Sequence, residues 1–307
     1  MEATSTQERP RDDTRSRSRS RATAFVFVGI APVIWGSHYL VTTEFLPPDR
    51  PLLAAALRAL PAGLTITLAY RQVPRGAWWW RVPVLGMLNF GLFFGLMFVA
   101  AYRIPGGTAA TIGTINLVFT IGLGWLVLRE RARWFQILGG LGGLGGVGLL
   151  VANASTPLDP IGLAAAVGGA ATFAAGLVMT KRWGRPAPVL LFTAWQLMAA
   201  GLVLLPLSLL LEGPVPHLTA GNITGYAYIG VLGTALAYSL MFKGLDLVPA
   251  AAASFLSLLN PLTASLLGLV VLGQTLTPLQ LLGAALVVAS IASGLMPGPA
   301  VPPTTRR

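Results

Sequence analysis

The chain has 307 residues, of which 54% are hydrophobic and only 10% are charged, and its mean hydropathy is +0.72. A soluble globular protein carries about 25% charged residues. A soluble chain of this composition would expose apolar patches far above the few hundred Å² that monomers roughly tolerate. The composition therefore excludes a soluble domain and predicts an integral membrane protein.

Ten stretches of about 20 mostly apolar residues, the length that a helix needs to cross a bilayer, follow one another along the chain. They are 22–41, 51–70, 79–101, 106–128, 134–152, 159–180, 188–211, 222–242, 248–272 and 277–296. Strands of a membrane barrel are about ten residues long and alternate in polarity. We therefore predict an all-α integral membrane fold with ten transmembrane helices.

The net charge of +11 is an orientation signal. With the N-terminus inside, all but three of the 21 Lys and Arg residues fall in cytoplasmic segments. The exceptions are Arg50 and Arg103 in external loops and Arg58 within a span. The positive-inside rule then places both termini in the cytoplasm. Because arginine greatly outnumbers lysine, as in high-GC bacteria, we expect a multi-pass protein of the bacterial inner membrane.

The two ends of the chain are expected to be cytoplasmic tails, at 1–21 and 297–307. The first contains an Arg/Ser-rich run at 15–21 and few apolar residues, which predicts disorder. Beside ten spans, such a run is typical of contact with anionic lipid, and we expect no nucleic-acid partner.

An internal repeat divides the membrane part into five-helix halves at 22–152 and 158–296. A shift of 144 residues aligns 94–150 with 238–294, and a shift of 138 aligns the second span with the seventh. The informative identities are Pro105/Pro249, Asn116/Asn260, Gln136/Gln280, Gly139/Gly283, Ala56/Ala194 and Gly63/Gly201. Because five is odd, the second half enters the membrane in the opposite sense. Inverted repeats are typical of transporters, with the substrate site near the membrane midplane.

Several motifs carry a resemblance to a known family. They are 31–37 (APVIWGS), 52–58 (LLAAALR), 101–107 (AYRIPGG), 128–130 (LRE) and 258–261 (LLNP). These motifs resemble the drug/metabolite transporter superfamily, and in particular the EamA-type exporters with paired five-helix repeats. The segments 35–44, 46–48 and 78–81 are most similar to the branch named for export of a blue pigment, indigoidine.

The resemblance implies a secondary-active transporter that exports a small metabolite or toxic compound by alternating access. Uptake or exchange of a small polar metabolite stays open as the alternative. The family often has a Gln/Asn–Pro pair in the fourth span. Here that position holds Asn116–Leu117, which leaves a helix kink at 117 open, while Asn260–Pro261 keeps the pair in the second half.

Arg58 is the charged residue that lies well inside a span. An arginine at a helix centre costs about 2.5–3.5 kcal/mol on insertion scales, so it must face the bundle or a cavity. Two hypotheses stay open. Arg58 recognises an anionic or carbonyl group of the substrate, or it forms a structural pair with Glu44 or Asp49 at the outer mouth.

Other polar and aromatic residues within spans are candidates for the cavity lining. His38 either titrates during transport or is a hydrogen-bonded interface residue. Asn116 and Asn260 occupy equivalent positions, and Pro261 can expose backbone carbonyls beside Asn260. Gln196 aligns with Arg58 under the shift of 138. The rings suited to stack a planar substrate, or simply to pack the core, are Trp35, Phe90, Trp195 and Tyr238.

Cysteine is absent and histidine occurs only at His38 and His217, which excludes thiolate chemistry and argues against a metal site. No nucleophile–base constellation is visible, so we predict neither a cofactor nor an enzyme. The glycine-rich run at 139–148 lacks the strand and the Lys–Ser/Thr of a nucleotide loop, and its spacing predicts close helix packing. Expected partners are a small-molecule substrate and the lipid bilayer, with a homodimer left open.

Overall fold

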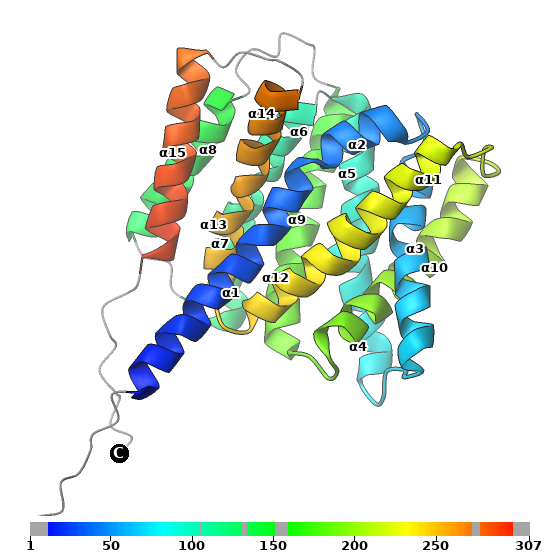
Figure 1. The fold of residues 1–307 in the computed structure, drawn as a ribbon, viewed down its shortest axis with the longest axis horizontal. Helices are drawn as coiled ribbons and strands as arrows, with labels where there is room; N and C mark the ends of the chain where they lie inside the picture. The colour runs from blue at the N-terminus through cyan, green and yellow to red at the C-terminus, as the bar shows by residue number, and fades with distance from the viewer. Residues whose placement is uncertain (1–11, 105, 131–133, 151–158, 272–276, 297–307) are drawn as a thin grey trace, which may run out of the picture.

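The computed structural model describes residues 12–104, 106–130, 134–150, 159–271 and 277–296 (Figure 1). Within these ranges every regular element is a helix, which confirms the predicted all-α class. The α-helices are α1 (Asp12–Gly36), α2 (His38–Phe45), α3 (Pro51–Tyr70), α4 (Trp78–Gly86), α5 (Leu92–Arg103), α6 (Gly106–Gly113), α7 (Asn116–Leu123), α8 (Trp134–Leu150), α9 (Pro160–Trp183), α10 (Val189–Leu211), α11 (Ala220–Ala227), α12 (Ala237–Leu245), α13 (Ala250–Ser257), α14 (Leu259–Val271) and α15 (Pro278–Leu295). The π-helices η1 (Met87–Gly91), η2 (Gly124–Leu128) and η3 (Tyr228–Leu236) are inserted between them.

Among the described residues, nine continuous helical stretches are long and apolar enough to cross a membrane. The one remaining predicted span, 134–152, corresponds to α8, which is shorter because its described part ends at Leu150. Its 17 residues cover about 25 Å at 1.5 Å per residue, most of a hydrocarbon core. Side chains such as Leu210, Val270 and Leu126 are more than two-thirds exposed, as expected where lipid is the solvent.

The N-terminal tail differs from the prediction of disorder over 1–21. Helix α1 begins at Asp12, so residues 12–21 continue the first span as helix. Adding a residue to an existing helix gains a hydrogen bond without a new nucleus, and arginine is a good helix former. The other tail residues, 1–11 and 297–307, lie outside the described residues.

Helix packing follows the repeat (Figure 1). The repeat-related helices α3 and α10 pack on each other at one edge of the bundle, and α8 and α15 do so at the other. The contact of α5 with α9 has its counterpart in α12 with α1, and that of α7 with α9 has its counterpart in α14 with α1. The two five-helix halves therefore interlock as a pseudo-symmetric, inverted pair.

Glycines permit the closest helix crossings. A Cβ at Gly63 would lie 2.4 Å from the Met198 nitrogen, and one at the equivalent Gly201 would lie 2.5 Å from the Leu60 Cβ. Gly146 and Gly283 permit a similarly close crossing of α8 and α15. A Cβ added to either glycine would lie under 3 Å from the carbonyl oxygen of the other. Gly142 instead faces open space, which corrects its expected packing role.

Both halves break a helix at equivalent places. The first break separates α6 from α7, where the Thr114 nitrogen donates to the Thr111 carbonyl at 3.1 Å. In the second half, between α13 and α14, the Leu258 nitrogen donates to the Phe255 carbonyl at 3.1 Å. Tight i→i+3 turns therefore interrupt the helix just before Asn116 as well as before Asn260, although position 117 holds no proline.

The helix ends define two faces of the bundle. On one, called the Asp159 face, α5 ends and α9 begins, and Arg103 pairs with Asp159 at 2.9 Å. The Glu212 carboxylate accepts from the Leu52 and Leu53 nitrogens there, at 2.6 and 2.9 Å, and so caps α3. On the other, called the Lys181 face, α9 ends and α13 begins.

Candidate functional site

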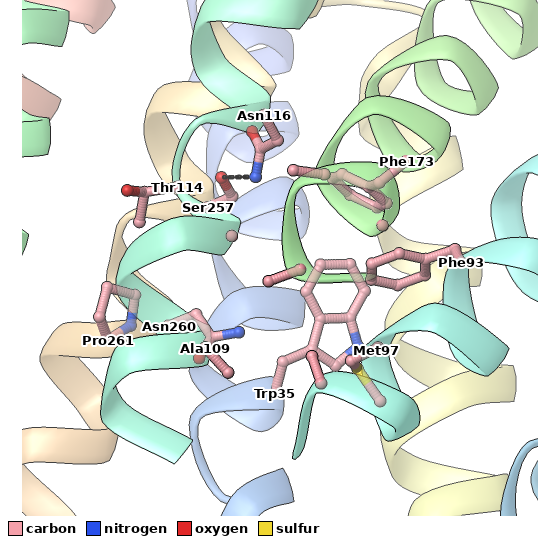
Figure 2. Close-up of a pocket in the computed structure, with 15 residues that line it drawn as sticks. Trp35, Phe93, Met97, Ala109, Thr114, Asn116, Phe173, Ser257, Asn260 and Pro261 are labelled. Carbon is pink, nitrogen blue, oxygen red and sulfur yellow. Dashed lines mark hydrogen bonds between the residues drawn. The ribbon is translucent and has the colours of Figure 1, made fainter. Parts of the chain in front are cut away.

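A cavity of about 100 Å³ lies between the two halves (Figure 2). Helices α1, α5, α6, α7, α9, α13 and α14 contribute to its wall, which includes Trp35, Asn116, Asn260 and Pro261. Lining residues Ala100 and Ala166 lie within two turns of the helix ends at the Asp159 face, so the cavity extends toward that face. At roughly 10–15 Å³ per water, it has room for a small molecule.

A second cavity of about 50 Å³ adjoins the first. The two share Trp35, Phe93, Met97 and Asn260, and the second continues to a polar end beside α3. We call this end the Arg58 station; it is formed by His38, Thr42, Arg58, Gly233 and Thr234. It brings α2, α3 and η3 together, so that both halves contribute to it.

Arg58 is 2% exposed and is held by neutral groups. Its Nε donates to the Thr234 hydroxyl at 2.6 Å and one terminal nitrogen donates to the Gly233 carbonyl at 3.3 Å. The guanidinium carbon lies 3.8 Å from the centroid of the Phe94 ring. The other terminal nitrogen, Nη1, has no hydrogen-bond partner. The structure shows no ion pair of Arg58 with Glu44 or Asp49, which corrects the structural-pair hypothesis for the described part of the chain.

His38 lies beside this guanidinium and is 5% exposed. Neither of its ring nitrogens is hydrogen-bonded, and a Cβ at Gly233 would lie 2.5 Å from its ring. The absence of a side chain at Gly233 therefore makes room for the imidazole. Together, Arg58 and His38 turn unpaired polar groups toward a buried space, and buried polar groups normally have partners.

Asn116 and Asn260 both line the first cavity (Figure 2). The Asn116 amide donates to the Ser257 hydroxyl at 3.5 Å, whereas the Oδ1 atoms of Asn116 and Asn260 have no partner. Pro261 lies beside Asn260 in the cavity wall. This end of the cavity therefore offers acceptors, and the Arg58 station offers donors.

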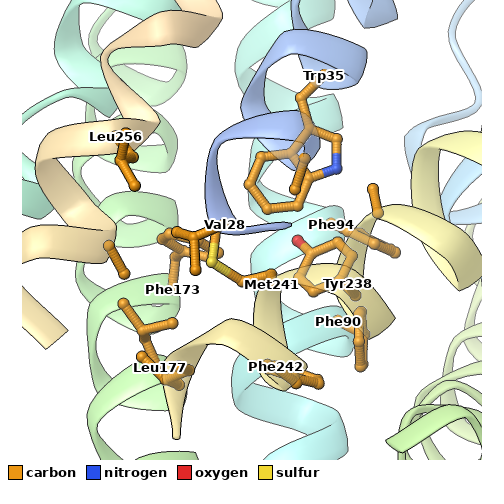
Figure 3. Close-up of a cluster of buried hydrophobic side chains, with 14 of the residues drawn as sticks. Val28, Trp35, Phe90, Phe94, Phe173, Leu177, Tyr238, Met241, Phe242 and Leu256 are labelled. Carbon is orange, nitrogen blue, oxygen red and sulfur yellow. The ribbon is translucent and has the colours of Figure 1, made fainter. Parts of the chain in front are cut away.

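Aromatic rings gather next to the cavities (Figure 3). Trp35 lines both cavities, and its indole nitrogen donates to the Gly233 carbonyl at 2.8 Å. Tyr238 lines the second cavity, with its ring 4.8 Å from Trp35 and 4.6 Å from Phe90. Phe90 is fully buried behind Tyr238 and lines neither of the two cavities. The aromatic residues that line the two cavities are therefore Trp35, Phe93, Phe98, Phe173 and Tyr238.

Trp195 and Gln196, both expected in the cavity lining, lie outside these two cavities. Trp195 packs with Val82 and Leu191, and its indole nitrogen donates to the Gln72 carbonyl at 2.8 Å. The Gln196 carbonyl accepts from the Asn89 amide at 2.9 Å, and the Asn89 amide also donates to the Thr180 hydroxyl at 3.0 Å.

Sequence reasoning missed several residues that complete the site. Thr234 and Phe94 hold the Arg58 guanidinium, Thr42 lines the second cavity, and Ser257 bonds Asn116. Thr234 could have been suspected from the sequence, because it is a hydroxyl residue within an apolar span and a buried arginine needs polar partners. Its identification requires the contact between α3 and η3, which composition does not reveal.

Ion pairs and hydrogen bonds close the Lys181 face beneath the cavities. The Glu130 carboxylate lies 3.0 Å from the Lys181 ammonium and accepts from the Ala250 nitrogen at 3.1 Å. Lys181 also donates to the Val248 carbonyl. This group, which we call the Glu130 latch, ties the end of α9 to the start of α13. At the Asp159 face, the ion pair of Arg103 with Asp159 ties the end of α5 to the start of α9.

A bundle of inverted helical repeats with a cavity at their interface, lined mainly by apolar side chains and by a few polar groups, is typical of a membrane transporter. A family model described as the EamA-like transporter family matches residues 22–152 and 160–294. The chain belongs to the EamA-like transporter family.

Individual proteins support this placement. The chain is 43% identical over 264 residues to Protein PecM of Dickeya dadantii, covering 85% of this chain and 88% of that protein. It is 30% identical over 278 residues to a Salmonella typhimurium protein named "probable amino-acid metabolite efflux pump", covering 84% and 90%. A solved crystal structure matches with a TM-score of 0.75 at 20% identity, covering 89% of this chain and 96% of that one, and it has the same fold.

Proposed function

We propose that this protein exports a small metabolite or toxic compound across the bacterial inner membrane by alternating access. The observation that carries the proposal is the cavity between the inverted halves, where the Nη1 of Arg58 and both nitrogens of His38 are buried without partners. Such groups are costly to bury unless a ligand or water satisfies them. The efflux name of the Salmonella relative supports export.

The arrangement corresponds to an outward-facing state. Most of the basic residues in the described loops lie near the helix ends at the Lys181 face, among them Arg71, Lys181 and Arg185. The positive-inside rule therefore makes that face cytoplasmic. Both termini are then cytoplasmic. The Glu130 latch closes this side, and the cavity extends toward the periplasmic Asp159 face.

The chemistry of the wall favours a small planar substrate with carbonyl or acidic oxygens. Arg58 and His38 supply donors at one end, the amide oxygen of Asn116 supplies an acceptor in the other cavity, and Asn260 and Trp35 line both cavities between them. A guanidinium recognises planar oxygen pairs through its fork of N–H groups.

The experiment that tests this function is efflux of a compound panel from cells with and without the protein. The panel contains planar molecules as matched acid and amide pairs. Faster loss of at least one compound from cells with the protein, abolished by Arg58→Ala in protein that still purifies as a folded monodisperse species, is expected. Accumulation in place of loss would show uptake, and an unchanged rate with Arg58→Ala would remove Arg58 from the site.

A further inference from the structure

A second buried polar cluster lies nearer the Lys181 face. The Asn89 amide nitrogen bonds both Gln196 and Thr180, at 2.9 and 3.0 Å, and the Asn89 Oδ1 has no partner. All three side chains are at most 3% exposed. Nothing in the transport site described above uses this cluster, which we call the Gln196 station.

The Gln196 station is the repeat counterpart of the Arg58 station. The shift of 138 residues places Arg58 on Gln196, Thr42 on Thr180 and His38 on Gly176. The shift of 144 residues places Asn89 on Gly233. The same positions of the two halves therefore build both clusters.

The contacts also correspond. A Cβ at Gly233 would meet the His38 ring at 2.5 Å, and a Cβ at Gly176 would meet the Asn89 side chain at 2.2 Å. In each station a glycine accommodates one polar side chain, and the partner helix carries a π-helical turn, η3 in one case and η1 in the other. Turns of this kind occur frequently at functional sites.

The two stations differ in access. The Arg58 station opens into a cavity, whereas neither cavity of the site reaches Asn89, Gln196 or Thr180. When an inverted-repeat carrier changes state, one half rocks against the other around the site. By pseudo-symmetry, the positions that line the cavity in one state have their repeat partners in the lining of the other.

We propose that the Gln196 station is the substrate-binding site of the state that opens to the Lys181 face. This inference rests on the proposed alternating-access function and extends it to a second site. The substrate is thereby narrowed to an uncharged planar molecule that carries an N–H donor beside its carbonyl oxygen, such as an amide. The unpartnered atom of the Gln196 station is the Asn89 Oδ1, which accepts such a donor, because the Asn89 amide nitrogen already bonds Gln196 and Thr180. A carboxylate at this station would be buried with no cation among the station's own residues.

The test uses single cysteines, since the natural chain has none. Thr180→Cys reports the Gln196 station, Thr42→Cys reports the Arg58 station, and Val178→Cys is a matched control. Val178 is 1% exposed and lies on α9 like Thr180, but its repeat partner Leu40 lines neither cavity. Each variant in native membranes is treated with N-ethylmaleimide, which requires a water-accessible thiolate.

We expect Thr180→Cys and Thr42→Cys to react and Val178→Cys to stay unreacted. Glu130→Gln is then added to each variant to remove the charge that pairs with Lys181. Loss of this ion pair should raise the population of the state open to the Lys181 face by up to about fivefold. Thr180→Cys is then labelled up to fivefold faster and Thr42→Cys more slowly. Local loosening near Lys181 would speed the first reaction without slowing the second.

An unreactive Thr180→Cys, or labelling of Thr180→Cys and Thr42→Cys that does not change in opposite directions, would overturn the Gln196 station. Export of acids without their amide partners in the compound panel would overturn the substrate class. Failure of the proposed function gives a different result, because then no compound leaves the cells faster whatever the labelling shows.

Discussion

Arg58 shows how one residue links the sequence to the site. A charge well inside an apolar span marks a functional position without any structure, because lipid makes it costly. Its partners, Thr234 and Gly233, lie about 175 positions away in the chain and belong to the other half. Only the fold shows that they hold the guanidinium and that Nη1 is left without a hydrogen-bond partner.

Arg58→Lys is predicted to lower efflux about tenfold or more, since an ammonium keeps the charge but cannot reproduce the fork that bonds Thr234, Gly233 and a ligand. Arg50→Lys is the matched control, because Arg50 donates only to loop carbonyls at the Asp159 face. Initial efflux rates at equal protein abundance are the measurement. Equal initial efflux rates for Arg58→Lys and Arg50→Lys would contradict the proposed role of the Arg58 guanidinium.

Asp159 predicts a pH-dependent contribution to stability. The hydrogen bond from Arg103 and those from the Ile161 and Gly162 nitrogens hold the pKa of this carboxyl below its usual value. A lowered folded-state pKa stabilises the fold above the unfolded pKa, near 4, and the stabilisation is lost as the pH falls through the folded pKa.

In detergent, the Tm of the wild-type protein should therefore be higher than that of Asp159→Asn at pH 7. This difference in Tm should disappear below about pH 4. Asparagine is itself a good N-cap, so the gap reports the charge. A gap that is constant with pH would assign the effect to capping geometry alone.

At the scale of elements, the glycine pair Gly63 and Gly201 sets how closely α3 and α10 approach. Gly63→Ala and Gly201→Ala are each predicted to lower the free energy of unfolding by about 1–3 kcal/mol, because the new methyl overlaps backbone of the facing helix. Gly142→Ala, where a Cβ meets nothing within 4 Å, should change it little. Denaturation of purified protein in detergent measures all three, and equal losses would contradict the crossing.

Some structural features could be predicted from the sequence and others could not, for physical reasons. Span 51–70 coincides with α3 because length and apolarity alone decide whether a helix crosses lipid. The sequence does not mark the break before Asn116, because its i→i+3 turn contains no proline. The sequence also does not place Trp195, because an indole packs equally well in a core or against a ligand. Only the observed packing against Val82 distinguishes these two locations.

At the scale of the whole molecule, orientation is directly testable in intact cells with a membrane-impermeant maleimide. Ile104, an otherwise natural choice for an external cysteine, is 4% exposed and unsuitable. Val215→Cys, in the exposed loop after α10, should be labelled from outside, and the equally exposed Val73→Cys should be protected until the cells are permeabilised. The opposite pattern reverses the assignment of the two faces.

The proposed alternating access requires the two halves to move against each other. Glu130→Cys combined with Lys181→Cys places a thiol on each side of the closed Lys181 face, where the native side chains lie 3.0 Å apart. Efflux of an exported compound is measured before and after a short bismaleimide joins them, with each single variant as a control. The account predicts that the cross-link abolishes efflux in the double variant alone, and undiminished efflux from the cross-linked protein would contradict it.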